Sequence, residues 1–335
     1  MAAPGGHPPV TALTDASLFP GATHTHLRVH TASARVTYLA KVNTRPGSAA
    51  VLAGEAASLN AFQGAPLRVP TPIAMGTVPA DADVIAGAGG NGGGSGGGGE
   101  DGGAFLLMEW VELVPFGASI PSVQAALGTA LARTHAEVTA ADDGYGFAVP
   151  TYLGATALDN TRSDDWAEFF LRQRLAPALA NAIASHGGGV TGTNAESAAA
   201  LSRHAAALLA DDGAAVRAVV AAGRGGVRPP PSLLHGDLWA GNVGATAAAT
   251  ATAGERQPVA VDPASWYGDA EFDLAVSRLY GALGAPFAAA YAAGAGWGKR
   301  GGRGSCGGRA HAASSPVHSL PVAESAQFAR GWIWA

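Results

Sequence analysis

The chain has 335 residues, of which 13% are charged, with a formal net charge of −5 and a single cysteine, Cys306. This length allows one large or two smaller domains, and the acidic balance provides no basic face for nucleic acid. One cysteine excludes an intramolecular disulfide, and no apolar run reaches the roughly 20 residues that a membrane helix needs. We therefore expect no nucleic-acid or membrane partner. We expect the protein to be located in the cytoplasm, or in a plastid if a transit segment precedes this sequence.

The first predicted element is a hairpin. Residues 1–18 show little periodicity and are expected to be irregular, whereas alternating apolar residues from Leu27 to Ala40 predict two antiparallel strands. The segment 19–26 before the hairpin contains one glycine, so its pattern leaves open whether it covers phosphates or only connects strands.

A lysine and a glutamate follow the hairpin in an order typical of kinases. Lys41 comes at the end of the second strand, as the phosphate-binding lysine of kinases does, although an exposed lysine at a strand edge has the same pattern. Apolar spacing over residues 49–62 predicts a helix that carries Glu55. A glutamate there can pair with Lys41 and hold it against the α- and β-phosphates of a nucleotide.

Residues 86–103 are almost all glycine and predict a flexible insertion between two strands. No strand-to-helix context frames this run, so it is not interpreted as a phosphate-binding loop. Residues 105–112 form the next predicted strand, and we expect a nucleotide hinge at Glu109, Trp110 and Val111, with Met108 behind the base. Without a catalytic loop elsewhere, the same strand would be an ordinary sheet edge.

Helical spacing predicts three further helices, over residues 122–138, after Ser163, and over 197–222 with an interruption at 211–213. Ser163 is the expected N-cap of the second helix. His135 lies near the end of the first, where we expect it to serve the C-terminal carbonyls rather than catalysis.

The strongest motif is His235-Gly236-Asp237, followed five positions after the aspartate by Asn242. His-Gly-Asp alone is ordinary loop chemistry, but kinase catalytic loops place an aspartate base and a metal-binding asparagine at this offset. An apolar strand then ends at Asp262, the position of the second metal-binding aspartate in such folds. Together, these residues in this order predict a phosphotransferase.

Three more carboxylates follow at Asp269, Glu271 and Asp273. We interpret the first two as the start of a helix over residues 272–280, and Asp273 as a tie between that helix and the catalytic loop. A second metal cluster is the alternative.

The chain resembles the fructosamine kinase/ketosamine-3-kinase family, in particular its protein-ribulosamine 3-kinase branch. The resemblance rests on residues 235–242 and 262–274, with supporting matches in family order between residues 38 and 291. Trp239, in His-Gly-Asp-Leu-Trp, separates this family from choline kinases and aminoglycoside phosphotransferases, which share only the looser pattern.

The resemblance implies an α+β, two-lobed, protein-kinase-like fold. A small β-rich N-lobe is expected at residues 1–111, a larger helical C-lobe at 112–294, and a low-complexity tail at 295–335. It further implies that ATP and Mg²⁺ are used to phosphorylate the O3 hydroxyl of ketosamines, on glycated proteins or as small molecules, which leads to deglycation. The roles implied for individual residues are the base (Asp237), Mg²⁺ ligands (Asn242, Asp262), the phosphate clamp (Lys41, Glu55) and substrate contacts (Trp239, His235). Trp239 as a core residue is an equal alternative.

Two departures from the family keep alternatives open. Segment 19–26 lacks the family's glycine pattern, and after Tyr291 the chain turns to low complexity where relatives continue with helices. We therefore expect apolar surface to be uncovered at Leu274, Val276, Leu279 and Phe287. The alternatives are a small-molecule phosphotransferase of the choline or aminoglycoside kinase type and a catalytically impaired pseudokinase. The preferred sugar and the oligomeric state are not determined by the sequence.

Overall fold

The computed structural model describes residues 10–16, 24–33, 37–78, 103–115, 120–142, 144–187, 193–223, 226–247, 256–280 and 283–295. The predicted glycine-rich insertion lies outside these ranges except for Gly103, which begins a strand. The predicted tail lies outside them after Ala295.

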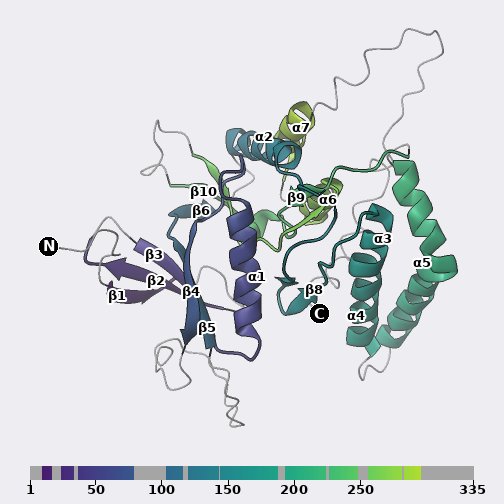
Figure 1. The fold of residues 1–335 in the computed structure, drawn as a ribbon, viewed down its shortest axis with the longest axis horizontal. Coiled ribbons are helices and arrows are strands. Elements are labelled where there is room, and N and C mark those ends of the chain that lie inside the picture. Colours follow the sequence, from purple (N-terminus) through teal and green to yellow (C-terminus); the bar gives the residue numbers. More distant parts are fainter. Residues whose placement is uncertain are drawn as a thin grey trace, which may run out of the picture.

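The N-terminal part is a five-stranded antiparallel sheet with one long helix beside it (Figure 1). The strand order is β1-β2-β3-β5-β4, and the predicted hairpin and helix are confirmed. The elements are β1 (Val10–Asp15), β2 (Thr25–Thr31), β3 (Thr37–Asn43), α1 (Ser48–Ala61), β4 (Pro72–Val78) and β5 (Gly103–Glu109).

The irregular start predicted for residues 1–18 is wrong for β1, which pairs with β2. β1 is an edge strand whose Val10 and Leu13 are exposed, so it shows no buried alternation in its sequence. Backbone hydrogen bonds to β2, rather than side-chain burial, hold this strand in place.

The remaining elements form a mainly helical second part with three small sheets. β10 pairs with β11 and β6, β12 with β9, and β7 with β8. The strands are β6 (Leu113–Pro115), β7 (Thr151–Leu153), β8 (Thr156–Leu158), β9 (Ser232–Leu234), β10 (Val243–Thr246), β11 (Pro258–Ala260) and β12 (Trp266–Gly268). The helices are α2 (Pro121–Glu137), α3 (Trp166–Phe170), π-helical η1 (Leu171–Leu175), α4 (Ala176–Gly187), α5 (Thr193–Gly223), 3₁₀-helical η2 (Ala240–Asn242), α6 (Glu271–Leu279) and α7 (Ala285–Gly294).

This arrangement confirms the predicted two-lobed α+β fold (Figure 1). The chain passes from the five-stranded sheet to the three-stranded sheet between Glu109 and Leu113, and the predicted division at residue 111 stays a prediction. Among the helices that the structure describes, none combines the length and hydropathy needed to cross a bilayer.

Aromatic rings pack around the strand that follows Asp262. Trp266 of β12 is fully buried, stacks on Trp166 (centroids 5.9 Å apart) and meets Phe169 at 5.3 Å. The Arg174 guanidinium lies over the Trp266 ring, 4.2 Å from its centroid. Burial lowers the pKa of Arg174 to about 9, so this cation–π contact is made by a weakly solvated cation. The packing fixes β12, and with it the segment that leads from Asp262.

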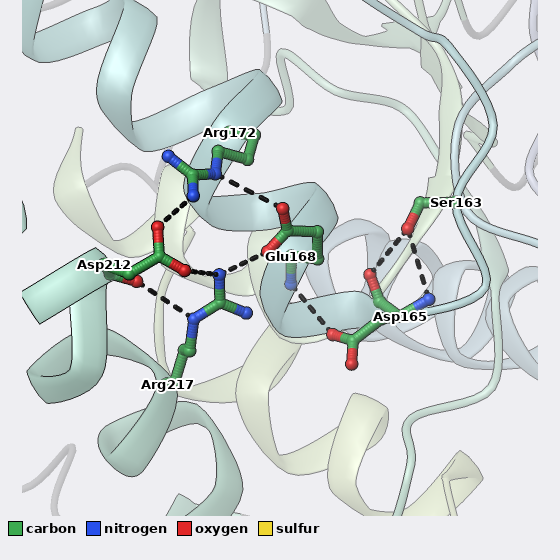
Figure 2. Close-up of polar contacts among 6 residues, drawn as sticks. All are labelled: Ser163, Asp165, Glu168, Arg172, Asp212 and Arg217. Carbon is green, nitrogen blue, oxygen red and sulfur yellow. Dashed lines mark hydrogen bonds and ion pairs between the residues drawn. The ribbon is translucent and has the colours of Figure 1, made fainter.

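The start of α3 is capped by Asp165, as Figure 2 shows. Asp165 Oδ1 accepts a hydrogen bond from the Glu168 N–H at 2.8 Å, so the prediction of Ser163 as the cap is wrong. Ser163 instead bonds to the Asp165 backbone, with its Oγ 3.2 Å from the Asp165 nitrogen. The helix begins at Trp166, so Asp165 occupies the N-cap position and Ser163 lies two residues before it.

The predicted interruption of the helix at residues 211–213 is confirmed. Asp211, Asp212 and Gly213 have φ values of 48°, 59° and 74° inside α5. Arg172 and Arg217 both pair with Asp212 and with Glu168, so they link this kink to α3 and η1 (Figure 2). The Asp212 side chain is 65% exposed, and such pairs orient the kink more than they stabilise it.

Helix α7 packs closely on α2 near the end of the described chain. Phe287 and Val276 are buried, so the prediction that they are uncovered is wrong, whereas Leu274 and Leu279 are half-buried. The close approach depends on Gly128, where an added Cβ would lie 2.3 Å from the Phe287 carbonyl oxygen.

We expect Gly128→Ala to lower the free energy of unfolding. The added methyl group meets backbone atoms of α7, and overpacking of about 1–3 kcal/mol outweighs the roughly 1 kcal/mol gain in helix propensity. Urea unfolding followed by tryptophan fluorescence measures the change. Thr129→Ala, at the exposed neighbouring position, should not destabilise the protein; equal stability of both variants would contradict close packing at Gly128.

Candidate active site

The loop between β9 and η2 carries Asp237 and is held by a buried carboxylate from α6. Asp273 is fully buried; its Oδ2 accepts the His235 N–H at 2.7 Å and its Oδ1 accepts the Gly236 N–H at 2.9 Å. The predicted tie between Asp273 and the catalytic loop is therefore confirmed. Burial by itself would raise the pKa of Asp273, but its hydrogen bonds and the charge of His135 hold this pKa below its ordinary value.

His135 extends this anchor to α2 and α7. Its Nε2 lies 3.2 Å from Asp273 Oδ2, and its Nδ1 lies 2.8 Å from the Tyr291 hydroxyl. The prediction that His135 serves helix carbonyls is wrong, although its role is structural as expected. Three helices thus meet at one carboxylate behind the loop.

The turn at Gly236 is possible only for glycine. Its φ is +84°, and an added Cβ would lie 2.1 Å from the Ala264 carbonyl oxygen. The Ala264 N–H in turn donates to the His235 carbonyl at 2.9 Å, so the loop is seated against the segment after Asp262.

His235 is fully buried, which is at odds with the predicted substrate contact. Its Nδ1 accepts the Asp237 N–H at 3.3 Å, so Nε2 carries the proton and donates to the Val261 carbonyl at 3.0 Å. Both ring nitrogens are therefore used inside the protein. Burial lowers the pKa of His235, which keeps the ring neutral.

Asn242 fixes the carboxylate of Asp237. Its Nδ2 donates to Asp237 Oδ2 at 2.7 Å and to the Asp237 carbonyl at 2.9 Å. Burial raises the pKa of Asp237 to about 6, helped by the charges of Asp262 and Asp273 and opposed by hydrogen bonds from Asn242 and Trp239. A carboxylate with a pKa close to neutral pH is well suited to accept a proton.

Lys41 joins the two lobes through two carboxylates. Its Nζ lies 2.6 Å from Glu55 Oε1, as predicted, and also pairs with Asp262. Lys41 and Glu55 are almost fully buried, whereas 45% of the Asp262 side chain is exposed. Burial opposes the charge on Lys41, but the two carboxylates raise its pKa overall. Lys41 in turn holds the pKa of Asp262 below its ordinary value, against the partial desolvation of this carboxylate.

Helix α1 is fastened to the segment after Asp262. Ser58 Oγ accepts the Ser265 N–H at 3.0 Å and donates to the Gly54 carbonyl at 2.8 Å. Ser58 lies one turn after Glu55, so this contact also fixes the helix that positions Glu55.

Asn242 and Asp262 have the donor atoms that Mg²⁺ prefers. The Val261 N–H donates to the Asn242 carbonyl at 2.9 Å. The backbone at Asn242 therefore lies beside the backbone just before Asp262. The Asn242 amide nitrogen points to Asp237, which leaves the amide oxygen as a ligand, and the Asp262 carboxylate is half exposed. In the described part of the chain, no three His, Cys, Asp or Glu side chains group as a metal site.

The predicted hinge lies between β5 and β6. Met108 is buried in the core, as expected for a residue behind the hinge. The Glu109 N–H already donates to the Thr71 carbonyl at 2.8 Å, and its carboxylate pairs with Arg68 at 2.7 Å. The Glu109 N–H is thus engaged within the protein, and the nucleotide role of the hinge stays a prediction.

Trp110 and Val111 of the hinge are half-buried. The Arg28 guanidinium lies 4.5 Å from the Trp110 ring centroid, and Trp110 Nε1 donates to Glu112. These contacts connect the hinge to β2.

Two histidines next to Lys41 were not assigned a role from the sequence. His26 lies opposite Lys41 in the β2–β3 pair, and His24 Nδ1 lies 3.2 Å from Asn43 Nδ2. Residues opposite each other in an antiparallel pair share a face, so both histidines lie on the Lys41 face. The alternation His24, His26, Arg28 in the sequence was the signal that could have shown this.

Trp239, the other predicted substrate residue, is half-buried and lies two residues after Asp237, the predicted base. Its ring centroid lies 5.5 Å from that of Tyr280. It is neither a fully buried core residue nor a free surface residue, so an acceptor could reach it.

The family model of the fructosamine kinases matches residues 9–298. The chain belongs to the fructosamine kinase family. A protein assigned as a ketoamine kinase in Synechocystis is 34% identical over 57% of this chain and 53% of its own length. The chloroplastic protein-ribulosamine 3-kinase of Oryza sativa subsp. japonica is 31% identical over 76% of this chain. The match spans 59% of that rice protein, which is less than two thirds of its length.

A crystal structure from Haemophilus somnus, assigned as a fructosamine-3-kinase, shares the fold. It superposes with a TM-score of 0.59 and 20% identity over 86% of this chain and 78% of that one.

We expect Asp273→Asn to destabilise the protein by about 3 kcal/mol at pH 7, because it removes a buried charge that two N–H groups and His135 require. The pKa of Asp273 is lowered on folding, so its contribution is full above the ordinary value near 4 and declines as pH falls below it.

Urea unfolding measures the free energy of unfolding of wild type and variant between pH 7 and pH 3.5. The difference between the two should become smaller below about pH 4. Asp164→Asn, at an exposed position, removes the same charge and should leave stability nearly unchanged. A gap that widens toward acidic pH would contradict the anchor.

Proposed function

We propose that this chain is an ATP-dependent ketosamine 3-kinase that phosphorylates the O3 hydroxyl of protein-bound ribulosamine or erythrulosamine, with fructosamine as a further substrate. The observation that carries the proposal is Lys41, which links Glu55 of α1 to Asp262 beside the Asp237–Asn242 pair. Protein kinases use the same lysine–glutamate pair to hold the nucleotide phosphates. Family membership supports the ketosamine as acceptor.

In the nucleotide site, Lys41 would contact the α- and β-phosphates while Glu55 restrains its side chain. Met108, Glu109, Trp110 and Val111 would line the adenine side, with Met108 behind the base. The backbone groups of Trp110 and Val111 are the better contacts for adenine, because the Glu109 N–H is already used.

Asn242 and Asp262 would hold Mg²⁺ through oxygen atoms. The ion, when bound, neutralises negative charge on the transferred phosphoryl group. Binding would draw Asp262 away from Lys41 and leave the ammonium free for phosphate oxygens.

Asp237 would accept the proton of the attacking O3 hydroxyl. As the new bond from O3 to the γ-phosphorus forms, the bond to the β-phosphate oxygen breaks and ADP leaves. Asn242 keeps the Asp237 carboxylate oriented, and the raised pKa keeps its basicity near neutral pH. Such a site works through positioning and charge neutralisation.

Trp239 would stack on the sugar or on the lysine stem. The proposed substrates are glycated proteins and small ketosamines, and loss of the phosphorylated adduct would complete deglycation. The names of the Synechocystis and rice relatives support this substrate class.

We expect the wild type to transfer phosphate from MgATP to a ribulosyl-lysine peptide, and Asp237→Asn to lose about 10²–10⁴-fold in kcat, because the base is removed. The Asp164→Asn control should retain full activity. Choline and an aminoglycoside are tested as acceptors in parallel. Transfer to these alone would favour a small-molecule phosphotransferase, and nucleotide binding without any transfer would favour a pseudokinase. Equal activity of wild type and Asp237→Asn would exclude Asp237 as the base.

We expect Glu55→Gln to weaken MgADP binding about tenfold, which is roughly 1.4 kcal/mol. Lys41 would then pair with Asp262 alone and be drawn from the phosphates. Isothermal titration calorimetry measures the affinity. Glu137→Gln, which removes an exposed carboxylate on α2, should bind as wild type does. Unchanged affinity of Glu55→Gln would show that the pair does not position Lys41 for nucleotide.

A further inference from the structure

Helix α6 brings a second side chain to the catalytic loop besides Asp273. Tyr280 follows directly after α6, seven residues beyond Asp273. Seven residues are almost two helical turns, so both side chains lie on one face of the helix, about 10.5 Å apart along its axis. Val276 and Ser277, between them on this face, are buried. Asp273 holds the loop at Gly236, and Tyr280 reaches the loop further along, at Trp239.

Tyr280 lies beside Trp239, two residues after the proposed base. Its ring centroid is 5.5 Å from that of Trp239, with the ring planes at 45°. Burial raises the pKa of Tyr280, and the negative charge of Asp237 raises this pKa further.

The Tyr280 hydroxyl has no hydrogen-bond partner among the described residues, although its oxygen is buried. An unpaired buried hydroxyl costs about 1–3 kcal/mol. A phenylalanine would make the same ring contact with Trp239 without this cost. The hydroxyl is therefore not explained by packing, and the ring that carries it contacts Trp239, two residues after Asp237.

We propose that the Tyr280 hydroxyl hydrogen-bonds a sugar hydroxyl of the acceptor, while the Trp239 and Tyr280 rings form the wall on which the sugar lies. This inference rests on the proposed function and narrows it to polyhydroxylated acceptors. A choline-type amino alcohol has one hydroxyl, which the reaction itself consumes, so it offers none to Tyr280. A site that hydrogen-bonds a substrate hydroxyl discriminates strongly against acceptors that lack it.

The test is Tyr280→Phe in the full chain, which removes one oxygen and keeps the ring. We expect kcat/KM for a ribulosyl-lysine peptide to fall about 10–100-fold, mainly through KM, while KM for ATP stays unchanged. Tyr152→Phe, at a half-buried tyrosine of β7, is the matched control and should behave as wild type. A merely structural role of the hydroxyl would change thermal stability or both KM values together.

Direct titration of the same peptide onto both proteins separates this inference from the proposed function. An active wild type with equal kcat/KM in Tyr280→Phe would overturn the role of Tyr280 and leave the kinase assignment intact. If the wild type binds the peptide without turnover, weaker binding by Tyr280→Phe supports the contact, and equal binding overturns it. No binding of the peptide by the folded wild type would overturn both.

Discussion

The fold of the C-lobe depends on one fully buried carboxylate, that of Asp273. A buried charge is tolerated only where hydrogen bonds and opposite charge compensate its lost hydration. The compensation comes from the backbone N–H groups of His235 and Gly236 and from the ring of His135, which Tyr291 supports. The loop, α2 and α7 must therefore meet at α6, and the position of Asp237 follows from that meeting.

A second cluster of charges joins the two lobes. Unlike the charge of Asp273, its negative charge is not fully compensated. Lys41 is one cation between two carboxylates, Glu55 and Asp262, so the cluster keeps a net negative charge. Burial next to this excess charge raises the pKa of Glu55, against the effect of Lys41. Such a cluster favours a further cation, and Asp262 is the partner with access to solvent. The solvent-accessible Asp262 can thus exchange Lys41 for another cation. The buried Asp273, by contrast, keeps its hydrogen bonds to the loop and to His135.

The sequence predicts those parts of this arrangement that depend on local spacing. The hairpin, the helix with Glu55 and the interruption near Asp211 all follow from short-range pattern. The tie of Asp273 to the catalytic loop was predicted from the order of the motifs, but the partners of His135, 138 and 156 positions away, could not be predicted. The motif also could not show that His235 faces inward, because loop residues next to a base are polar whether they support the backbone or contact substrate. β1 was missed because backbone pairing, not burial, holds it.

The two halves of the candidate site are positioned by two different helices. α1 positions the proposed nucleotide side, through Glu55 at Lys41 and through Ser58 at Ser265. α6 positions the proposed acceptor side, through Asp273 at the loop of Asp237 and Tyr280 at Trp239. Because Asp273 and Tyr280 share one helical face, a small displacement of α6 would move the proposed base and the proposed acceptor wall together. Their relative geometry would then be preserved, and the alignment left variable would be that of acceptor against phosphate. The Ser58–Ser265 bond is one of the contacts that span this division, because it joins α1 to the segment that runs from Asp262 toward α6.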